Sequence, residues 1–473
     1  MARAALTAGR RAVGRAIADR GGRPAEGTAG GLLGRGVEKT AGVLSIRVLL
    51  LGAGIAIGVL LPLCASRDDV GLVFLAQSLI AVAATLAQLG LSYSASALLP
   101  AALALGDTGR VRTVAVRSLA LAALAGATVG ALLWLALTWI EARSTTSLAI
   151  GALAVAAPLI AASVPLAALQ TLMSELYRGL GAVLRASLLA TGASLPVAIA
   201  LIGAWAAGLR LTFDAVLGVG LVGFVALAGL GGIGLARRAA RWNAEARTPI
   251  RTAELWASAW PNLVLSLVLF VLGQADLWIV ALLGDTGTLA NYGLGLRMAT
   301  LVTLPLAIVN VVAGPMIAVL WTRRKPRVLQ RLLLRVAAVA STGAAAGYSL
   351  VLAIGEPLVE RLWGADYGDV LLYFSILGFG QLCHAAGGSS GVALIVLGRQ
   401  REVMRISAAT GGLTVVLAAL AAAWLNATGI ALAFSAGLIA QTWLFSRALH
   451  RSFNVDATVW HAVALLRRRA VRP

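Results

Sequence analysis

Runs of about twenty apolar residues recur along the whole chain, and they constrain its fold more than any other feature. A helix of that length spans the hydrocarbon core of a bilayer, and so many runs exclude a soluble domain behind a single signal peptide. Of the 473 residues, 60% are hydrophobic and only 12% are charged, whereas a soluble domain carries about a quarter charged residues. The sequence therefore predicts an all-α polytopic membrane protein.

The apolar runs predict twelve membrane spans, and the basic residues support this number. Both termini and the connections on one side of the membrane hold 34 lysine and arginine residues, whereas the opposite connections hold four. Cytoplasmic loops carry such an excess, so we expect both termini in the cytoplasm. The predicted spans cover about residues 43–64, 70–99, 114–139, 146–174, 184–208, 214–236, 259–283, 289–320, 333–355, 369–397, 404–425 and 428–449.

The spans form two similar halves. Segment 66–79 resembles 287–301, and 180–194 resembles 397–412, each time at an offset of about 219 residues. Six spans in each half, both entering from the same side, predict two pseudo-symmetric lobes that rock about a central site. The predicted parts are a basic tail at 1–42, an N-lobe at 43–236, a basic linker at 237–258, a C-lobe at 259–449 and a basic tail at 450–473.

Two full charges lie within the predicted seventh and eighth spans, although a charge in lipid costs about 3 kcal/mol or more. Asp276 precedes the polar turn GDTGTLAN and Arg297 follows it, at a similar depth of roughly 10–15 Å below the outer surface. One interpretation is a buried ion pair that joins the two spans. The other is that Arg297 faces a central cavity and holds an anionic group, while Asp276 orients or releases it.

Further candidate residues are Arg47 and several uncharged polar side chains. Arg47, at the start of span one, is either a basic anchor at the membrane surface or a cavity residue, because spans one and seven open the two halves. Gln77, Gln274 and Asn310 either line a sugar-binding cavity or form hydrogen bonds between helices. Prolines 305 and 315 predict a joint in span eight.

The distribution of acidic residues bears on the substrate. Within the first six spans acidic residues occur only at the ends, at Glu175 and Asp214. An exporter of cationic drugs needs a carboxylate inside the membrane, so this scarcity counts against one. A cavity with few acids and with arginines suits an anion, and a diphosphate is well matched by guanidinium donors.

The sequence offers no constellation for catalysis or metal binding. The two cysteines and the three scattered histidines fit neither a disulfide framework nor a metal centre, and no GxxxxGK[ST] motif indicates ATP hydrolysis. We therefore expect no enzymatic activity, no metal and no cofactor. We assign the net charge of +20 to the loops of a membrane protein rather than to binding of nucleic acid.

Three stretches carry motifs of one known family. LPLCASRDDVGLVFLAQSLIAVAATLAQLGL has a short polar loop, a glycine and a terminal LGL; LGDTGTLANYGLGLRMATL opens the second half; and IGEPLVERLWGADYGD, with a later IVLGRQ, has the GE, WG and LG pairs. These stretches resemble the polysaccharide flippases of the multidrug, oligosaccharidyl-lipid and polysaccharide exporter superfamily. The resemblance covers about residues 40–450.

The resemblance implies a flippase that carries a polyprenyl-diphosphate-linked oligosaccharide to the outer leaflet of a bacterial cytoplasmic membrane, for cell-surface polysaccharide biosynthesis. Membrane lipids and glycosyltransferase or polymerase partners are implied as well. The lipid II branch is similar but usually has fourteen helices, with cavity arginines on its first, second and eighth. Arg47 and Arg297 match two of these, whereas span two offers Gln77 instead. The alternatives are a lipid II flippase, an ion-coupled multidrug efflux transporter and a non-transporting membrane scaffold.

Overall fold

The structure is a computed structural model that describes residues 49–50, 52–143, 148–191, 193–242, 252–283 and 285–461. Arg47 and the predicted tail at 1–42 lie outside the described residues. The chain divides into two compact units, Met1–Leu49 and Leu50–Pro473, and the helices named below belong to the second. No strand occurs in the part of the chain that the structure describes, so the prediction of an all-α protein is confirmed.

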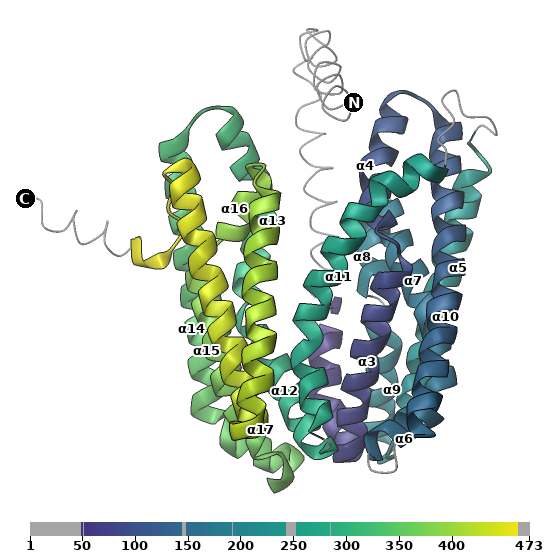
Figure 1. Cartoon of the computed structure of the whole chain (residues 1–473), viewed down its shortest axis with the longest axis vertical. Helices are drawn as coiled ribbons and strands as arrows, with labels where there is room; N and C mark the ends of the chain where they lie inside the picture. Colours follow the sequence, from purple (N-terminus) through teal and green to yellow (C-terminus); the bar gives the residue numbers. More distant parts are fainter. Residues whose placement is uncertain are drawn as a thin grey trace, which may run out of the picture. The chain divides into compact units, whose positions relative to one another are not determined.

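The N-lobe is a bundle in which α7 packs against α3, α4, α5 and α10 (Figure 1). Small residues let α5 approach α7: a Cβ atom on Gly126 would lie 2.6 Å from the Cα of Pro165, and one on Gly130 would lie 2.5 Å from the carbonyl oxygen of Ala161. The lobe contains the helix Gly52–Cys64, α3 (Arg67–Ala87), α4 (Leu91–Ala104), α5 (Thr108–Glu141), α6 (Leu148–Val155), α7 (Ala157–Gly179), α8 (Val183–Thr191), α9 (Ser194–Ala206) and α10 (Phe213–Ala239).

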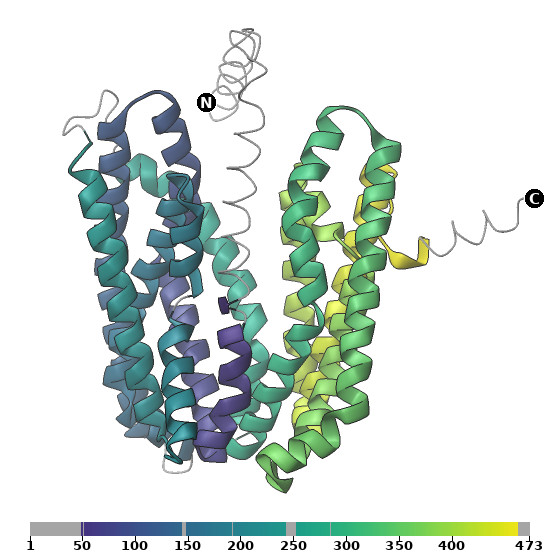
Figure 2. The same ribbon diagram turned by 180° about the vertical axis from the view of Figure 1, so that it is seen from behind.

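The C-lobe is built around α15, which packs against α12 on one side and against α17 on another (Figure 2). Its first helix, α11, contacts both lobes, because it packs against α3 and α4 as well as against α17. The lobe contains α11 (Thr252–Leu282), α12 (Thr286–Val302), α13 (Leu304–Thr322), α14 (Pro326–Trp363), the 3-10 turn η1 (Ala365–Tyr367), α15 (Asp369–Ala386), α16 (Ser390–Val396) and α17 (Gln400–Phe453).

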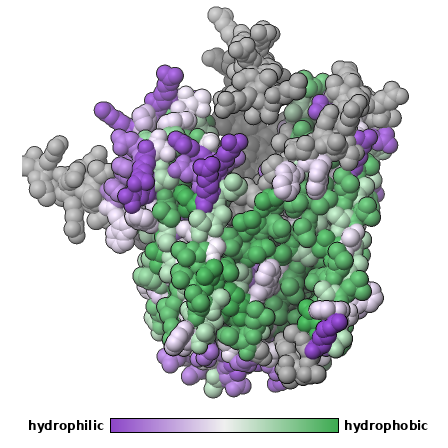
Figure 3. Space-filling view, viewed as in Figure 1, coloured by the Kyte–Doolittle hydropathy of each residue, from purple (hydrophilic) through white to green (hydrophobic). Residues whose placement is uncertain are grey.

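The described helices make twelve spans. Seven are long and apolar enough to cross a membrane, and three pairs of helices, each bent by more than 40°, bring the number to ten. One of the seven, α17, holds two spans that meet at Asn426, whose φ of 51° and ψ of −140° are not helical. The helix Gly52–Cys64 belongs to the remaining span. Figure 3 shows the expected result, an apolar middle zone between hydrophilic ends.

Of the predicted spans that the structure breaks, two are broken at a glycine with positive φ. The prediction for 70–99 is wrong at Gly90, and that for 369–397 is wrong at Gly388. Both glycines have positive φ, +71° and +61°, and both lie against the backbone of another segment. A Cβ atom would approach the carbonyl oxygen of Ala259 to 2.2 Å in the first case and that of Ala457 to 2.3 Å in the second, so only glycine fits.

Other boundaries agree more closely with the sequence. The predicted turn between spans 404–425 and 428–449 coincides with Asn426. The bend of 44° between Thr286–Val302 and Leu304–Val311 lies directly before Pro305, as the prolines of span eight predict. Described helices extend into the predicted linker 237–258, because α10 ends at Ala239 and α11 begins at Thr252.

Candidate functional site

The equivalent helices of the two halves, α3 and α12, pack against each other in register. A Cβ atom on Gly71 would lie 2.4 Å from the carbonyl oxygen of Thr286, and one on Gly293 would lie 2.3 Å from the ring of Phe74. Thr286 also donates a hydrogen bond to Asp68, which is 218 residues away in sequence. Because this separation is close to the repeat offset, the helices meet along the pseudo-twofold axis that relates the halves.

Arg297 lies on this α3–α12 contact, and its partners among the described residues are uncharged. Its guanidinium donates a hydrogen bond to the side-chain oxygen of Gln77, 220 residues away, and lies 4.6 Å from the centroid of the Phe74 ring. Among the described residues, no ion pair involves Arg297. Arg297 follows Asp285, the N-cap of α12, by twelve residues, which places it about 18 Å along the helix.

Asp276 lines a cavity in the C-lobe and has no contact with Arg297 among the described residues. It follows a 47° bend in α11, between Asn262–Leu272 and Ala275–Leu282, and is 3% exposed. Its carboxylate accepts hydrogen bonds from the backbone N–H of Leu277, at 2.9 Å, and from the hydroxyl of Tyr292, at 3.5 Å. No ion pair joins Asp276 to Arg297 in the described structure, so the ion-pair interpretation is wrong.

A cavity of about 360 Å³ in the C-lobe contains Asp276 and Gln274 in its wall. Its other polar lining comes from α12, α15 and α17: Thr300, Gln381, Ser407, Thr410, Thr414, Ser435 and Gln441. Gln441 donates to the hydroxyl of Ser407 across 2.8 Å, which holds two spans of the wall together. Sequence reasoning missed the hydroxyl residues of span eleven, although their spacing of three and four residues along one helix face indicates a common surface.

A separate cavity of about 340 Å³ lies against the N-lobe and contains Gln77 in its wall. Gln88, Gln170, Thr85 and Thr171 supply further polar groups, and Phe270 of α11 contributes from the C-lobe. No charged side chain is among the described residues that line it. The wall therefore offers amide and hydroxyl groups, of the kind that bind uncharged polar molecules.

The structure separates the candidate residues into groups. Arg297 and Gln77 are in contact, and Gln274 and Asp276 share the C-lobe cavity. Asn310 is in neither group: it accepts a hydrogen bond from Ser389, which joins α13 to the turn before α16. This is the interhelical role that the sequence left open for it.

Contacts between segments of the two lobes close the end at which α3 and α12 begin. Besides the bond from Thr286 to Asp68, the indole N–H of Trp363 donates to the carbonyl oxygen of Val59 at 3.0 Å. Asp285 caps α12 by accepting from the backbone N–H groups of residues 287 and 288. The hydroxyl of Thr288 also donates to this carboxylate, and this bond in particular lowers the pKa of Asp285.

Comparison with known proteins shows which known structures share this fold. No model of a known protein family and no curated protein sequence matches the chain. Among solved structures, an inward-facing multidrug resistance MATE family transporter of the MOP superfamily is similar, with a TM-score of 0.72 and 15% identity over 88% of this chain and 98% of that chain.

Two further structures are similar. An outward-facing MATE family transporter matches with a TM-score of 0.56 and 15% identity, over 87% of this chain and 93% of that chain. The lipid II flippase MurJ, in an inward closed conformation, matches with a TM-score of 0.62 and 13% identity, over 87% of each chain. The chain therefore has the fold of MOP superfamily transporters, with twelve spans in two lobes.

Proposed function

We propose that the protein is a transporter of a bacterial cytoplasmic membrane that flips a polyprenyl-diphosphate-linked oligosaccharide to the outer leaflet by alternating access. The observation that carries this proposal is Arg297, a guanidinium with uncharged partners on the pseudo-twofold axis between the lobes. A cation at this depth costs free energy unless it faces protein or water, and a bound anion would offset that cost. Diphosphate oxygens suit the forked donors of arginine.

The cavity beside Gln77 fits the uncharged part of such a substrate. Its glutamine and threonine side chains offer donors and acceptors to sugar hydroxyls, and it adjoins the helix face that contacts Arg297. Because no charged side chain is among the described residues of its wall, the cavity favours a neutral glycan over a cation. We therefore assign the diphosphate to Arg297 and the first sugars to this wall.

The conformation supports alternating access. The contacts between α3 and α12 close the end that the basic-residue pattern assigns to the outside of the membrane. The fold is also more similar to the inward-facing MATE structure, with a TM-score of 0.72, than to the outward-facing one, with 0.56. Both observations favour a state open toward the cytoplasm, in which a lipid-linked substrate made there would enter.

Lipid analysis of cells depleted of the protein tests this function. We expect one completed polyprenyl-diphosphate oligosaccharide to accumulate, as measured by mass spectrometry of extracted lipids. The accumulated species also names the cargo, so a build-up of lipid II would favour the lipid II alternative. An unchanged lipid pool would contradict a flippase and favour a non-transporting scaffold. Glycosyltransferase or polymerase partners remain a prediction from the sequence resemblance.

One observation favours ion-coupled multidrug efflux as a second candidate. Asp276 is a buried carboxylate in a cavity of about 360 Å³, where a proton, a metal cation or a cationic drug would neutralise it. Efflux predicts that overproduction raises resistance to cationic drugs and that Asp276→Asn abolishes this resistance. The flippase proposal predicts the same drug susceptibility with and without the protein.

A further inference from the structure

The C-lobe has another cavity, of about 640 Å³, that takes no part in the contact between α3 and α12. It is formed by the end of α15, the last turns of α17 and the segment that follows α17. In both views this last segment lies on the side of the C-lobe turned away from α3 (Figures 1 and 2). The volume lies in the range typical of small-molecule sites.

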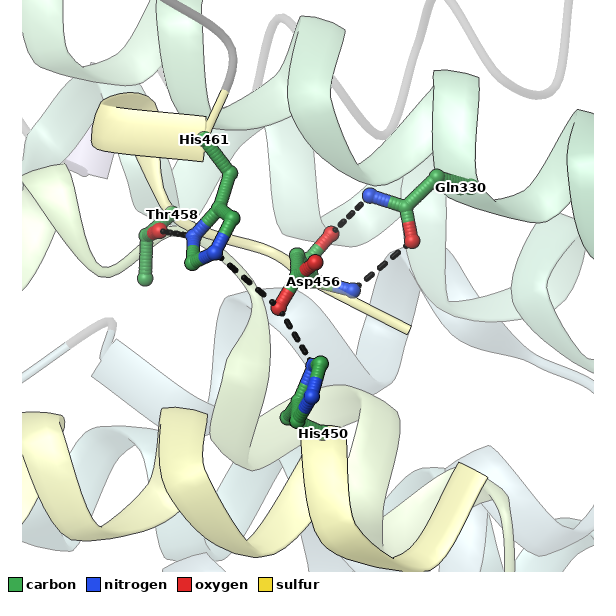
Figure 4. A network of polar contacts seen from close by, with 5 residues as sticks. All are labelled: Gln330, His450, Asp456, Thr458 and His461. Atoms are coloured by element: carbon green, nitrogen blue, oxygen red, sulfur yellow. Dashed lines mark hydrogen bonds and ion pairs between the residues drawn. The ribbon is translucent and has the colours of Figure 1, made fainter. Parts of the chain in front are cut away.

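A polar network fixes one wall of this cavity (Figure 4). Gln330 of α14 holds the backbone of Asp456 by two hydrogen bonds, 2.7 Å to its N–H and 2.8 Å to its carbonyl oxygen. One carboxylate oxygen of Asp456 then lies 2.9 Å from Nδ1 of His450 and 3.6 Å from Nε2 of His461. The other ring nitrogen of His461 contacts the hydroxyl of Thr458 at 2.9 Å. The network thus positions two imidazoles at the cavity.

The lining contains one arginine, two histidines and one acid. Asp456 already contacts both imidazoles, and among the described residues no ion pair involves Arg447. The guanidinium of Arg447 lies 4.9 Å from the centroid of the Trp443 ring, which orients it. The described residues offer no hydrogen bond to Nε2 of His450. Arg447 and His450, one turn apart on α17, are therefore available to an anion, His450 in its imidazolium form, because its Nδ1–H already donates to Asp456 and only a protonated Nε2 can donate further.

The rest of the lining is suited to lipid. Ile439, Ala386 and the two tryptophans Trp443 and Trp460 supply apolar surface, and the tryptophans are 56% and 73% exposed. Exposed tryptophans are enriched at the headgroup level of membranes, where an apolar ring and a polar N–H both find partners. The cavity also lies at the basic end of the protein, where the sequence continues with Arg467, Arg468 and Arg469.

We propose that this cavity binds the phosphate group of an anionic phospholipid from the leaflet at the basic end, with Arg447 and His450 as its donors. The glycerol and the first acyl carbons would lie against Trp443 and Ile439. A soluble phosphate would use the cationic groups but leave this apolar wall in water, so a lipid fits the whole lining better. The site is distinct from Arg297 and would anchor the C-lobe in its leaflet.

Native mass spectrometry of the delipidated full chain tests the proposal, with phosphatidylglycerol and phosphatidylcholine of identical acyl chains. We expect the wild type to retain phosphatidylglycerol about 10-fold more tightly, since charge-assisted hydrogen bonds carry the difference. The double variant Arg447→Gln/His450→Gln should lose this preference. Arg451→Gln removes an exposed arginine of the same helix end that does not line the cavity, and it should keep the preference.

A second measurement needs no cavity variant and locates the site. Cys383 lines the cavity, whereas Cys64 is only 1% exposed, so N-ethylmaleimide labelling reports mainly on Cys383. Phosphatidylglycerol should slow this labelling several-fold more than phosphatidylcholine. The proposal would be overturned if the two lipids slowed the labelling equally. It would also be overturned if, in the mass-spectrometry experiment, Arg451→Gln lost the preference for phosphatidylglycerol as fully as the double variant. Slowing by inorganic phosphate alone, to the same degree, would show a soluble-anion site and also overturn it.

Discussion

At the residue scale, Arg297 carries a full positive charge, and its two partners in the described structure are neutral. Gln77 and Phe74 orient its guanidinium by a hydrogen bond and by ring stacking, but neither compensates its charge. An ion pair would have made Arg297 a structural link and left it less able to bind a substrate. The arrangement instead leaves the residue able to exchange a weak neutral partner for an anion.

Gln77→Glu tests this role of Arg297. The new carboxylate would form an ion pair with the guanidinium and compete with a phosphate. We expect the flipping rate in proteoliposomes to fall about 10-fold or more, while the melting temperature stays the same or rises. Gln400→Glu, the same change at the exposed first residue of α17, is the control and should flip at the wild-type rate. Unchanged flipping by Gln77→Glu would make Arg297 a structural residue.

Asp285 predicts a pH dependence of stability. Hydrogen bonds from Thr288 and the start of α12 lower its pKa, so the carboxylate stabilises the folded state above its unfolded pKa of about 4 and this contribution is lost as the pH falls through the folded value. We expect Asp285→Ala to lower the free energy of unfolding at pH 7 by about 1 kcal/mol. The difference between the proteins should shrink below pH 4. A pH-independent difference in melting temperature would contradict this origin.

The charged residues of this site could be predicted from the sequence, but their partners could not. Asp276 and Arg297 are conspicuous because charges are rare in apolar spans. Their proximity in one hairpin suggested an ion pair, yet Arg297 contacts Gln77 of the other half and Asp276 contacts Tyr292. Local spacing does not reveal which side of α12 faces α3, because that choice depends on packing between the lobes.

At the scale of the elements, the main feature is the contact between α3 and α12, which joins the two lobes. Backbones meet at Gly71, where a Cβ atom would lie 2.4 Å from the carbonyl oxygen of Thr286 and 3.1 Å from the backbone nitrogen of Ala290. The repeat already placed Gly71 and Ala290 in register. The structure adds that these equivalent positions contact each other on the pseudo-twofold axis.

Gly71→Leu should favour separation of the two helices at this end. Overpacking costs about 1–3 kcal/mol, enough to shift the ratio of open to closed states about 5- to 150-fold. Spin labels at Arg210 and Glu356, both exposed, should show longer distances by pulsed electron paramagnetic resonance. Gly229→Leu, at an exposed glycine with nothing within 4 Å of its Cβ position, is the matched control and should leave the distances unchanged. Equal distances in both variants would exclude the α3–α12 contact as the closing element.

Element breaks were predicted only where a local signal exists. Pro305 indicates the bend in span eight, and the polar Asn426 indicates the turn between the last spans. The breaks at Gly90 and Gly388 depend on close contact with Ala259 and Ala457, which are distant in sequence. Hydropathy averages over such glycines, so it predicts the right number of spans and overlooks their discontinuities.

At the scale of the whole molecule, the charge asymmetry of the sequence predicts the orientation in the membrane. In a single-cysteine background, Arg143→Cys should react with a membrane-impermeant maleimide added to intact cells, whereas Arg401→Cys should react only after the cells are permeabilised. Both positions are exposed in the structure, so a difference reports on sidedness and not on burial. Labelling of Arg401→Cys in intact cells would contradict the assigned orientation.

The central claim is that the two lobes move a diphosphate-linked lipid past Arg297, and a flipping assay tests it most directly. Proteoliposomes containing a fluorescent polyprenyl-diphosphate disaccharide would be treated with the impermeant quencher dithionite. We expect the wild type to expose the inner-leaflet pool to quenching, Arg297→Gln to do so about 10-fold or more slowly, and Arg451→Gln to match the wild type. Quenching by the wild type no faster than in protein-free vesicles, or at equal rates in Arg297→Gln and the wild type, would contradict the account.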